Sequence, residues 1–256
     1  MQIGISTLCT FGKTYSVLDE LLALDIEVLE VLEDWKDRMN KGRIRRLREA
    51  RQSNGIRYTV HAPILDMNIA SSNDRFRALS TGFVMDSIRH AREIDAELVV
   101  VHPGVYTPLE RVVPKIHWEL NKESLRKIIA CAEDLGVRVA VENMPAHSDC
   151  LLQTVEEFRT LAEEGLPLRM TLDVGHANTV SQLKPFLETM RERIIHVHLH
   201  DNRGSNDDHM IVGAGTIDWD IIKSNLNLDR VAGIVEANSL ADAKASLKKV
   251  RQLFSS

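Results

Sequence analysis

Cysteine is scarce in this chain of 256 residues. The three cysteines, Cys9, Cys131 and Cys150, are odd in number and widely spaced, and no CxxC pair occurs. This pattern does not build a disulfide framework and is more typical of a protein from a reducing compartment.

Long hydrophobic runs are also missing. No apolar stretch approaches the roughly 18–20 residues that a membrane span requires. The first residues, "MQIGISTLCTFGK", lack a charged segment followed by an apolar one, so they do not resemble a secretory signal peptide. We therefore expect a soluble cytoplasmic protein without a membrane partner.

An excess of positive charge is absent as well. The chain has 32 Lys and Arg residues against 37 Asp and Glu residues, which gives a formal net charge of −5. General nucleic-acid binders are usually basic, so the charge disfavours a nucleic-acid partner without excluding a local basic groove. The best candidate for such a groove is "KGRIRRLREAR" (41–51). The spacing of Ile44, Leu47 and Ala50 favours instead an amphipathic helix with solvated arginines.

Short β-branched runs alternate with longer helical patterns along the whole chain. Near-continuous apolar runs of this kind are typical of parallel strands covered by helices. The expected strands are 2–6, 26–32, 56–61, 97–102, 137–142, 169–173, 194–200 and 231–236. No Pro/Gly/Ser-rich linker interrupts the rhythm, and "STLCTFGKTY" is a poor match to the Gly-rich turn of a doubly wound sheet. We expect one domain, 1–256, folded as a (β/α)₈ TIM barrel with its active site at the carboxyl ends of the strands.

Polar residues end six consecutive expected strands, at positions that converge on one face of such a barrel. Glu142 and Asp173 follow strongly apolar runs, where an unpaired carboxylate is costly to desolvate, and neither has an adjacent lysine or arginine. A bound metal ion would supply the missing positive charge. Imidazole and carboxylate ligands without thiolate favour zinc, manganese, cobalt or iron. The strand-end candidates are His61, His102, Glu142, Asp173 with His176 in "LDVGH", His198 and Glu236, and the loop "NDDHM" adds Asp207 and His209.

The ordered set HAP, HPG, VEN, DVGH, HLHD, DDH…GAG and VEAN resembles the xylose-isomerase-like TIM-barrel superfamily over nearly the whole chain. That group contains sugar and sugar-phosphate isomerases and epimerases, and also the endonuclease IV family of abasic-site DNA repair enzymes. In the isomerase and epimerase members, the resemblance implies one divalent metal, Zn²⁺ or Mn²⁺, on Glu142, Asp173, His198 and Glu236. It implies that the two glutamates act as an acid/base pair through a metal-stabilised enediolate, with His176 contacting the substrate.

The same resemblance carries a second implication. In endonuclease IV three zinc ions use nine ligands, and all nine residue types are present here. The nine matching positions are His61, His102, Glu142, Asp173, His176, His198, Asp207, His209 and Glu236. The resemblance thus implies one to three ions and leaves two activities open. The charge favours a small sugar or sugar-phosphate substrate over abasic-site DNA. A homo-oligomer is compatible with the sequence, and a non-catalytic metal- or sugar-binding barrel is the least favoured reading.

For several further residues, the sequence leaves the position or the role open. In "RIIHVHLHDN" we assign His196 to the barrel lining and His200 to the rim near substrate, while Asp201 either orients a ligand histidine or starts the next loop. Other residues are expected in ordinary structural settings. We expect Trp35, Phe11 and Trp219 in a sugar-pocket wall or in packing, His90 and His117 on the surface, His147 in an exposed loop and Cys131 in the core.

Overall fold

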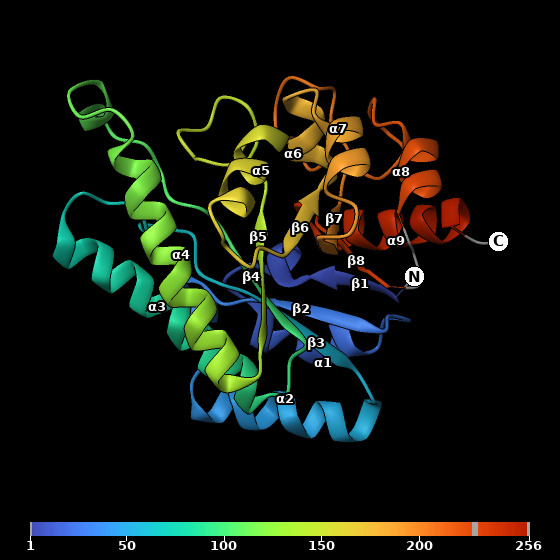
Figure 1. The fold of residues 1–256 in the computed structure, drawn as a ribbon. Coiled ribbons are helices and arrows are strands. Elements are labelled where there is room, and N and C mark those ends of the chain that lie inside the picture. Colours follow the sequence, from blue (N-terminus) through green and yellow to red (C-terminus); the bar gives the residue numbers. More distant parts are fainter. Residues whose placement is uncertain (1, 227–229, 255–256) are drawn as a thin grey trace.

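The computed structural model describes residues 2–226 and 230–254. Eight parallel strands pair in chain order and close into a barrel (Figure 1). The strands are β1 Gln2–Ser6, β2 Val28–Leu32, β3 Arg57–His61, β4 Leu98–Val101, β5 Arg138–Glu142, β6 Met170–Asp173, β7 Ile194–Leu199 and β8 Ala232–Val235. Each expected run contains its strand to within two residues at either end. The (β/α)₈ fold expected from the sequence is therefore confirmed.

Every strand is followed by at least one helix of the outer layer (Figure 1). The α-helices are α1 Leu18–Leu22, α2 Lys41–Asn54, α3 Asp74–Glu93, α4 Ile116–Leu135, α5 Val155–Glu163, α6 Val174–Thr179, α7 Leu183–Thr189, α8 Trp219–Asn225 and α9 Leu240–Phe254. The short 3₁₀ helices are η1 Thr7–Thr10, η2 Thr14–Ser16, η3 Trp35–Asp37 and η4 Pro108–Arg111. Within the described ranges, no helix combines the length and the apolar composition needed to cross a bilayer.

Helix α2 has the amphipathic form expected for 41–51. Ile44, Leu47 and Ala50 are buried against the barrel. Two of its arginines bind neighbouring parts of the protein, because Arg46 contacts Asp19 and Arg51 contacts Asp95. The basic run is therefore largely explained by packing and by ion pairs within the chain.

The barrel interior changes character along its axis. Successive strand residues point alternately inward and outward, so one residue in two lines the interior. Two small apolar clusters, separate from the larger cluster beneath the helices, fill its amino-terminal half: Val28, Ala232 and Ile234 in one, and Leu98, Val100 and Ala140 in the other. Two residues further along the same faces come Glu30, His102, Glu142 and Glu236. The strands thus carry their apolar inward residues first and their ionisable ones at the carboxyl end.

The loop between β7 and α8 is organised by Asp201. Its buried carboxylate accepts hydrogen bonds from the backbone N–H of Asn202 at 2.9 Å and of Gly213 at 3.0 Å, and from Nε1 of Trp219 at 3.1 Å. Of the two alternatives for Asp201, the structure supports the start of the loop. Trp219 is buried in packing, which excludes it from a pocket wall. This loop carries Asp207 and His209.

Of the two histidines expected at the surface, His117 is a wrong prediction and His90 lies there only in part. His117 on α4 is fully buried, because the segment before the helix folds over it: Oγ1 of Thr107 lies 2.8 Å from Nε2, and the Glu110 carboxylate lies 2.7 Å from Nδ1. His90 on α3 is partly buried, with Nδ1 2.7 Å from the buried carboxylate of Glu33. Cys131 is only partly buried, so the expected core position is also corrected, whereas His147 is exposed as expected.

Candidate metal centre

Four of the predicted residues form a central site at the carboxyl ends of neighbouring strands. Glu142 ends β5, Asp173 ends β6, His198 lies on β7 and Glu236 follows β8. One ligand atom from each lies within 4.8 Å of the others, and all four side chains are buried. The strand register explains the convergence, because Asp173 pairs directly with His198 across β6 and β7. Nδ1 of His198 lies 2.8, 3.6 and 3.7 Å from carboxylate oxygens of Glu142, Asp173 and Glu236.

A second group shares Glu142 with the central site. Nε2 of His61 lies 3.2 Å from Oε2 of Glu142, and Nε2 of His102 lies 3.0 Å from the same oxygen. His61 ends β3 and His102 follows β4, so these residues approach Glu142 from the other side of the barrel mouth. The shared carboxylate could bridge two ions.

A third group surrounds Asp207 in the loop after β7. Nε2 of His176 and Nε2 of His209 both lie 3.1 Å from Oδ2 of Asp207. His176 lies on α6 rather than in the loop expected after β6, because the Asp173 carboxylate accepts the backbone N–H of His176 and caps that helix. All nine residues matched from the sequence are thus brought to one end of the barrel.

His200 belongs to this third group and does not project from the rim as expected. It is fully buried, its Nε2 lies 3.0 Å from the Asp173 carboxylate and 3.6 Å from Asp207, and its ring stacks on His209. Glycine at position 175 makes room for it, because a Cβ there would lie 2.0 Å from Cε1 of His200. The glycine in "DVGH" was the available signal.

Sequence reasoning also missed Glu30, in the middle of β2. Its fully buried carboxylate lies 3.1 Å from Nε2 of His198 and 3.2 Å from Nε2 of His196, and it accepts a hydrogen bond from Thr59 at 3.1 Å. His196 lines the barrel as expected. A signal was present, since a glutamate in the apolar run "VLEVL" shares the inward face of Val28 by period two.

Two ligand-type histidines have one ring nitrogen held by a backbone carbonyl. Nδ1 of His61 lies 2.8 Å from the oxygen of Ala62, and Nδ1 of His176 lies 2.7 Å from the oxygen of Asn143. A carbonyl oxygen only accepts, so each Nδ1 carries the proton. Each Nε2, which faces the carboxylates, keeps a lone pair in the neutral ring. This is the usual arrangement of metal-binding histidines.

The carboxylates and histidines of the metal-free chain shift one another's pKa values. Burial alone raises the pKa of Glu142, but His198 and His102 outweigh it and hold that pKa well below its usual range. Burial lowers histidine pKa values, yet the hydrogen bond to Glu142 raises the pKa of His61 to about 9. Asp173 likewise raises the pKa of His176 to about 10, and Asp207 raises that of His209 to about 9. Protons therefore supply positive charge that a metal ion would otherwise supply.

The donor sets fit divalent ions that accept nitrogen and oxygen ligands, such as Zn²⁺ and Mn²⁺. Among the described residues, buried polar atoms at the third group lack any hydrogen-bond partner, namely Nδ1 of His200, Nδ1 of His209 and Oδ1 of Asp207. Such orphaned atoms are costly unless something binds them. The residues present are therefore compatible with one central ion and with further ions beside it.

Aromatic side chains stand at the same end of the barrel. Trp35, just after β2, is 57% exposed and its ring centroid lies 5.8 Å from that of Phe11, which follows β1. A pocket wall and rim packing remain alternatives for this pair.

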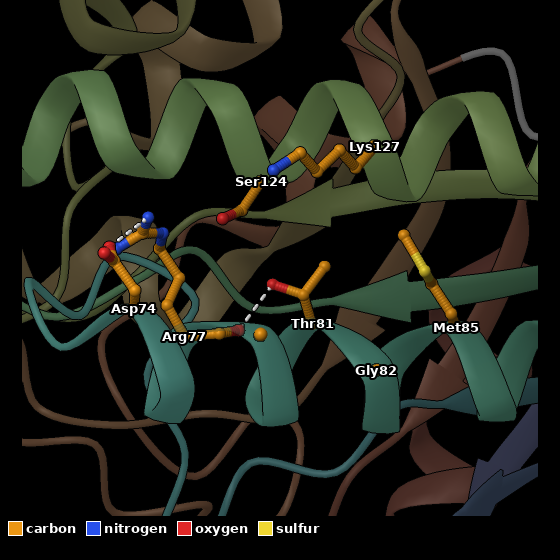
Figure 2. A pocket seen from close by; sticks show the side chains of 8 residues that line it. Asp74, Arg77, Thr81, Gly82, Met85, Ser124 and Lys127 are labelled. Carbon is orange, nitrogen blue, oxygen red and sulfur yellow. Dashed lines mark hydrogen bonds and ion pairs between the residues drawn. The ribbon is translucent and has the colours of Figure 1, made fainter.

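A separate groove of about 270 Å³ lies between α3 and α4 in the outer layer (Figure 2). Its side chains largely bind one another: Arg77 contacts Asp74 at 2.7 Å, and Oγ1 of Thr81 donates to the Arg77 carbonyl at 2.8 Å. None of the candidate ligands is among the residues that line this groove.

Comparisons with known proteins agree with this architecture. An uncharacterised protein of Methanocaldococcus jannaschii is 30% identical over 98% of this chain and 89% of its own length. The solved structure of a D-tagatose 3-epimerase-like protein covers 99% of this chain and 97% of its own, with a TM-score of 0.92 and 29% identity. Endonuclease IV from Thermus thermophilus has the same fold, with a TM-score of 0.73 and 22% identity over 99% of this chain and 98% of its own.

Structural relatives thus include both sugar epimerases and endonuclease IV. The family profile described as "Xylose isomerase-like TIM barrel" matches residues 18–253, so the chain belongs to the xylose isomerase-like TIM-barrel family.

Proposed function

We propose that this protein is a divalent-metal-dependent isomerase or epimerase of a sugar or sugar phosphate, with Glu142 and Glu236 as its acid/base pair. The observation that carries the proposal is the buried central site of Glu142, Asp173, His198 and Glu236. The likeness to a D-tagatose 3-epimerase-like protein over almost the whole chain supports it.

The difficult step of such a reaction is removal of a proton from a carbon next to a carbonyl or hydroxyl group. A divalent ion held by the central site would polarise substrate oxygens and stabilise the negative charge that develops there. Glu142 on β5 and Glu236 after β8 are separated by two intervening strands of the barrel wall. From these positions one glutamate takes the proton and the other returns one, so a proton can leave one face of the carbon and arrive on the opposite face.

His176 is suited to orient the substrate. Its Nδ1 proton is held by the carbonyl of Asn143, and its Nε2 faces the barrel mouth beside Asp207. With its pKa raised to about 10, His176 also carries a proton on Nε2, so that nitrogen donates a hydrogen bond to a sugar oxygen. Trp35 and Phe11 then offer an apolar surface on which the face of the sugar that carries its C–H groups can pack.

An endonuclease IV-like phosphodiesterase is the second candidate. It is favoured by the three neighbouring groups, which include all nine matched residues and could hold three ions. It is disfavoured by the net charge of −5 and by α2, whose arginines Arg46 and Arg51 bind acidic residues of the chain itself. A DNA-binding rim needs free positive charge.

One set of measurements separates the candidates. We expect the purified protein to bind a divalent metal and to incorporate solvent deuterium next to the carbonyl of a ketose or ketose phosphate during epimerisation. Glu142→Gln and Glu236→Gln should abolish this exchange. Glu33→Gln, which changes another buried glutamate outside the three groups, should not. Three zinc ions per chain with metal-dependent nicking of abasic-site DNA, and no exchange with any sugar, would establish the second candidate.

A further inference from the structure

Glu30 is an ionisable group that the proposed reaction does not use. It lies below the central site, one layer deeper in the barrel, and its side chain is fully buried. The groups around its carboxylate are two histidines of β7, His196 and His198, and the hydroxyl of Thr59 on β3. A buried carboxylate is expensive, and replacing it by an apolar residue of similar size is often neutral or stabilising for the fold. Packing therefore gives no reason for a glutamate here.

The contact between Glu30 and His198 gives a reason for the glutamate. An imidazole ring has two nitrogens, and in the neutral ring one carries a proton while the other has a free lone pair. Nε2 of His198 lies 3.1 Å from Oε1 of Glu30, while Nδ1 faces the carboxylates of the central site, 2.8 Å from Glu142. An ionised carboxylate only accepts hydrogen bonds, so in the metal-free chain each ring nitrogen directs a proton at a carboxylate, Nε2 at Glu30 and Nδ1 at Glu142. When an ion replaces the proton on Nδ1, Glu30 keeps the proton on Nε2 and so leaves the lone pair on Nδ1.

We propose that Glu30 is a positioning residue of the metal centre, which fixes the tautomer and the ring orientation of His198 so that Nδ1 is presented to the ion. The inference rests on the proposed function, because it assumes an ion in the central site. It extends a pattern within the chain: His61 and His176 are held in the same way by backbone carbonyls, with the two nitrogens exchanged. His198 differs in that a side chain does the holding, so the interaction can be removed by substitution.

A competing arrangement would place a separate ion between Glu30, His196 and His198, whose ligand atoms also lie within 4.8 Å of one another. Simultaneous occupation of both sites would require His198 to bind ions through both nitrogens and to lose both ring protons. A hydrogen bond from Nε2–H to Glu30 needs no such step. The geometry therefore favours positioning over a second ion.

The test compares Glu30→Gln and Glu30→Leu with Glu33→Gln. Glu33 is a matched control, because its side chain is also fully buried and also binds a histidine, His90 at 2.7 Å. Among the described residues, its carboxylate otherwise accepts the backbone N–H of Met39 and touches no candidate ligand, and the backbone hydrogen bond from Glu33 to His61 is unaffected by the substitution. Metal affinity is measured by competition with a chromogenic chelator, and the number of bound ions by elemental analysis. Folding is checked by circular dichroism.

We expect both Glu30 variants to bind as many ions as the wild type with an affinity reduced 10- to 100-fold, the usual effect of removing such a partner. Glu33→Gln should bind as the wild type does. Unchanged affinity in a folded Glu30→Leu protein would overturn the inference. Loss of one whole ion with unchanged affinity for the rest would overturn it in favour of the separate ion.

A second readout needs neither metal nor substrate. In metal-free protein labelled with ¹⁵N-histidine at pH 7, the ring shifts should show that Nε2 of His198 carries a proton, because Glu30 accepts it. In Glu30→Leu that acceptor is gone, so the remaining proton should lie on Nδ1, beside Glu142. A wild-type His198 without a proton on Nε2 would refute the inference even if an epimerase activity is found. Conversely, wild-type protein that binds no divalent ion would refute the proposed function, while the tautomer would still decide whether Glu30 positions His198.

Discussion

Raising the pH from 6 to 8 should increase the metal affinity, and the size of the increase should depend on how many ions the protein binds. Four histidines of the three groups have raised pKa values in the metal-free chain. Burial lowers the pKa of His198, but Glu236 and Glu142 raise it well above the ordinary value of 6.5. The pKa values of His61, His176 and His209 are raised to about 9, about 10 and about 9. Burial lowers the pKa of His102 below its ordinary value, so this ring is not counted among the protonated ligands.

A histidine must lose its proton on the coordinating nitrogen before it binds a metal, so each protonated ligand releases one proton. A single ion in the central site displaces one proton, from His198. Three ions displace four, from His61, His176, His198 and His209. The protons on His61 and His209 are lost as the pH rises through about 9, and the proton on His176 as it rises through about 10. The pKa of His198 is also raised well above its ordinary value, so all four protons are held in the pH 6–8 window. Affinity therefore rises with pH in this window and levels off above it.

Each released proton changes the binding constant about tenfold per pH unit. One ion should therefore bind about 100-fold more tightly at pH 8 than at pH 6, and the product of the binding constants for three ions should change by about eight orders of magnitude. Calorimetric titration at pH 7 in two non-coordinating buffers of different ionisation enthalpy measures the proton number directly. About one proton supports the mononuclear epimerase, and about four support the trinuclear alternative. Metal binding that is independent of pH and releases no proton would refute the assignment of these histidines as ligands.

Three further predictions follow from the same contacts. Removal of the metal by a chelator should lower the melting temperature by about 5–11 °C relative to protein with metal at 100 times its Kd. Binding at that concentration stabilises the fold by about 2.7 kcal/mol, and the melting temperature of a chain of this size changes by about 2–4 °C per kcal/mol. An unchanged melting curve would contradict a metal centre. At saturating metal, Glu142→Gln and Glu236→Gln should each reduce kcat by about 10²–10⁴-fold, as expected for loss of a general acid or base, and full turnover in both would refute the two-glutamate mechanism. Gly175→Ala should destabilise the fold by about 1–3 kcal/mol, because the Cβ of the alanine would overlap the ring of His200. Denaturant unfolding measures this loss. Gly82→Ala on α3 is the control, because a Cβ at that position meets open space.

The sequence could predict the fold, and that nine candidate residues meet at one end of the barrel, for one physical reason. In a parallel barrel every strand delivers its last inward residue to the same end, so polar residues that end apolar runs must meet there. Glu142 and Asp173 could be predicted as candidate ligands because their strands are otherwise apolar. The loop residues Asp207 and His209 could be predicted only from the family resemblance and from the local excess of acidic residues and histidine.

Other features could not be predicted from strand ends. Glu30 sits mid-strand, and whether a mid-strand glutamate points inward depends on the barrel register. His200 was placed at the rim because it follows β7, but the missing Cβ at Gly175 lets its ring turn back toward Asp173. His117 was placed at the surface because nothing in the sequence near α4 indicates that Thr107 and Glu110 fold over it. Each error depends on a tertiary contact with another segment, which the ends of the strands alone do not reveal.

The three alternating histidines on and directly after β7 have different contacts because they lie at different depths in the barrel. Period two puts His196, His198 and His200 on one face, but each is a layer further along the axis. Among the residues that the structure describes, His196 lies at ion-pair distance from one carboxylate, that of Glu30. His198 lies between Glu30 and the central site, and His200 contacts Asp173 and Asp207. His198 is therefore the residue of the strand through which the deeper carboxylate can act on the metal centre. A change at Glu30 should accordingly affect the metal through His198, whereas a change at His196 should leave Nδ1 of His198 where it is.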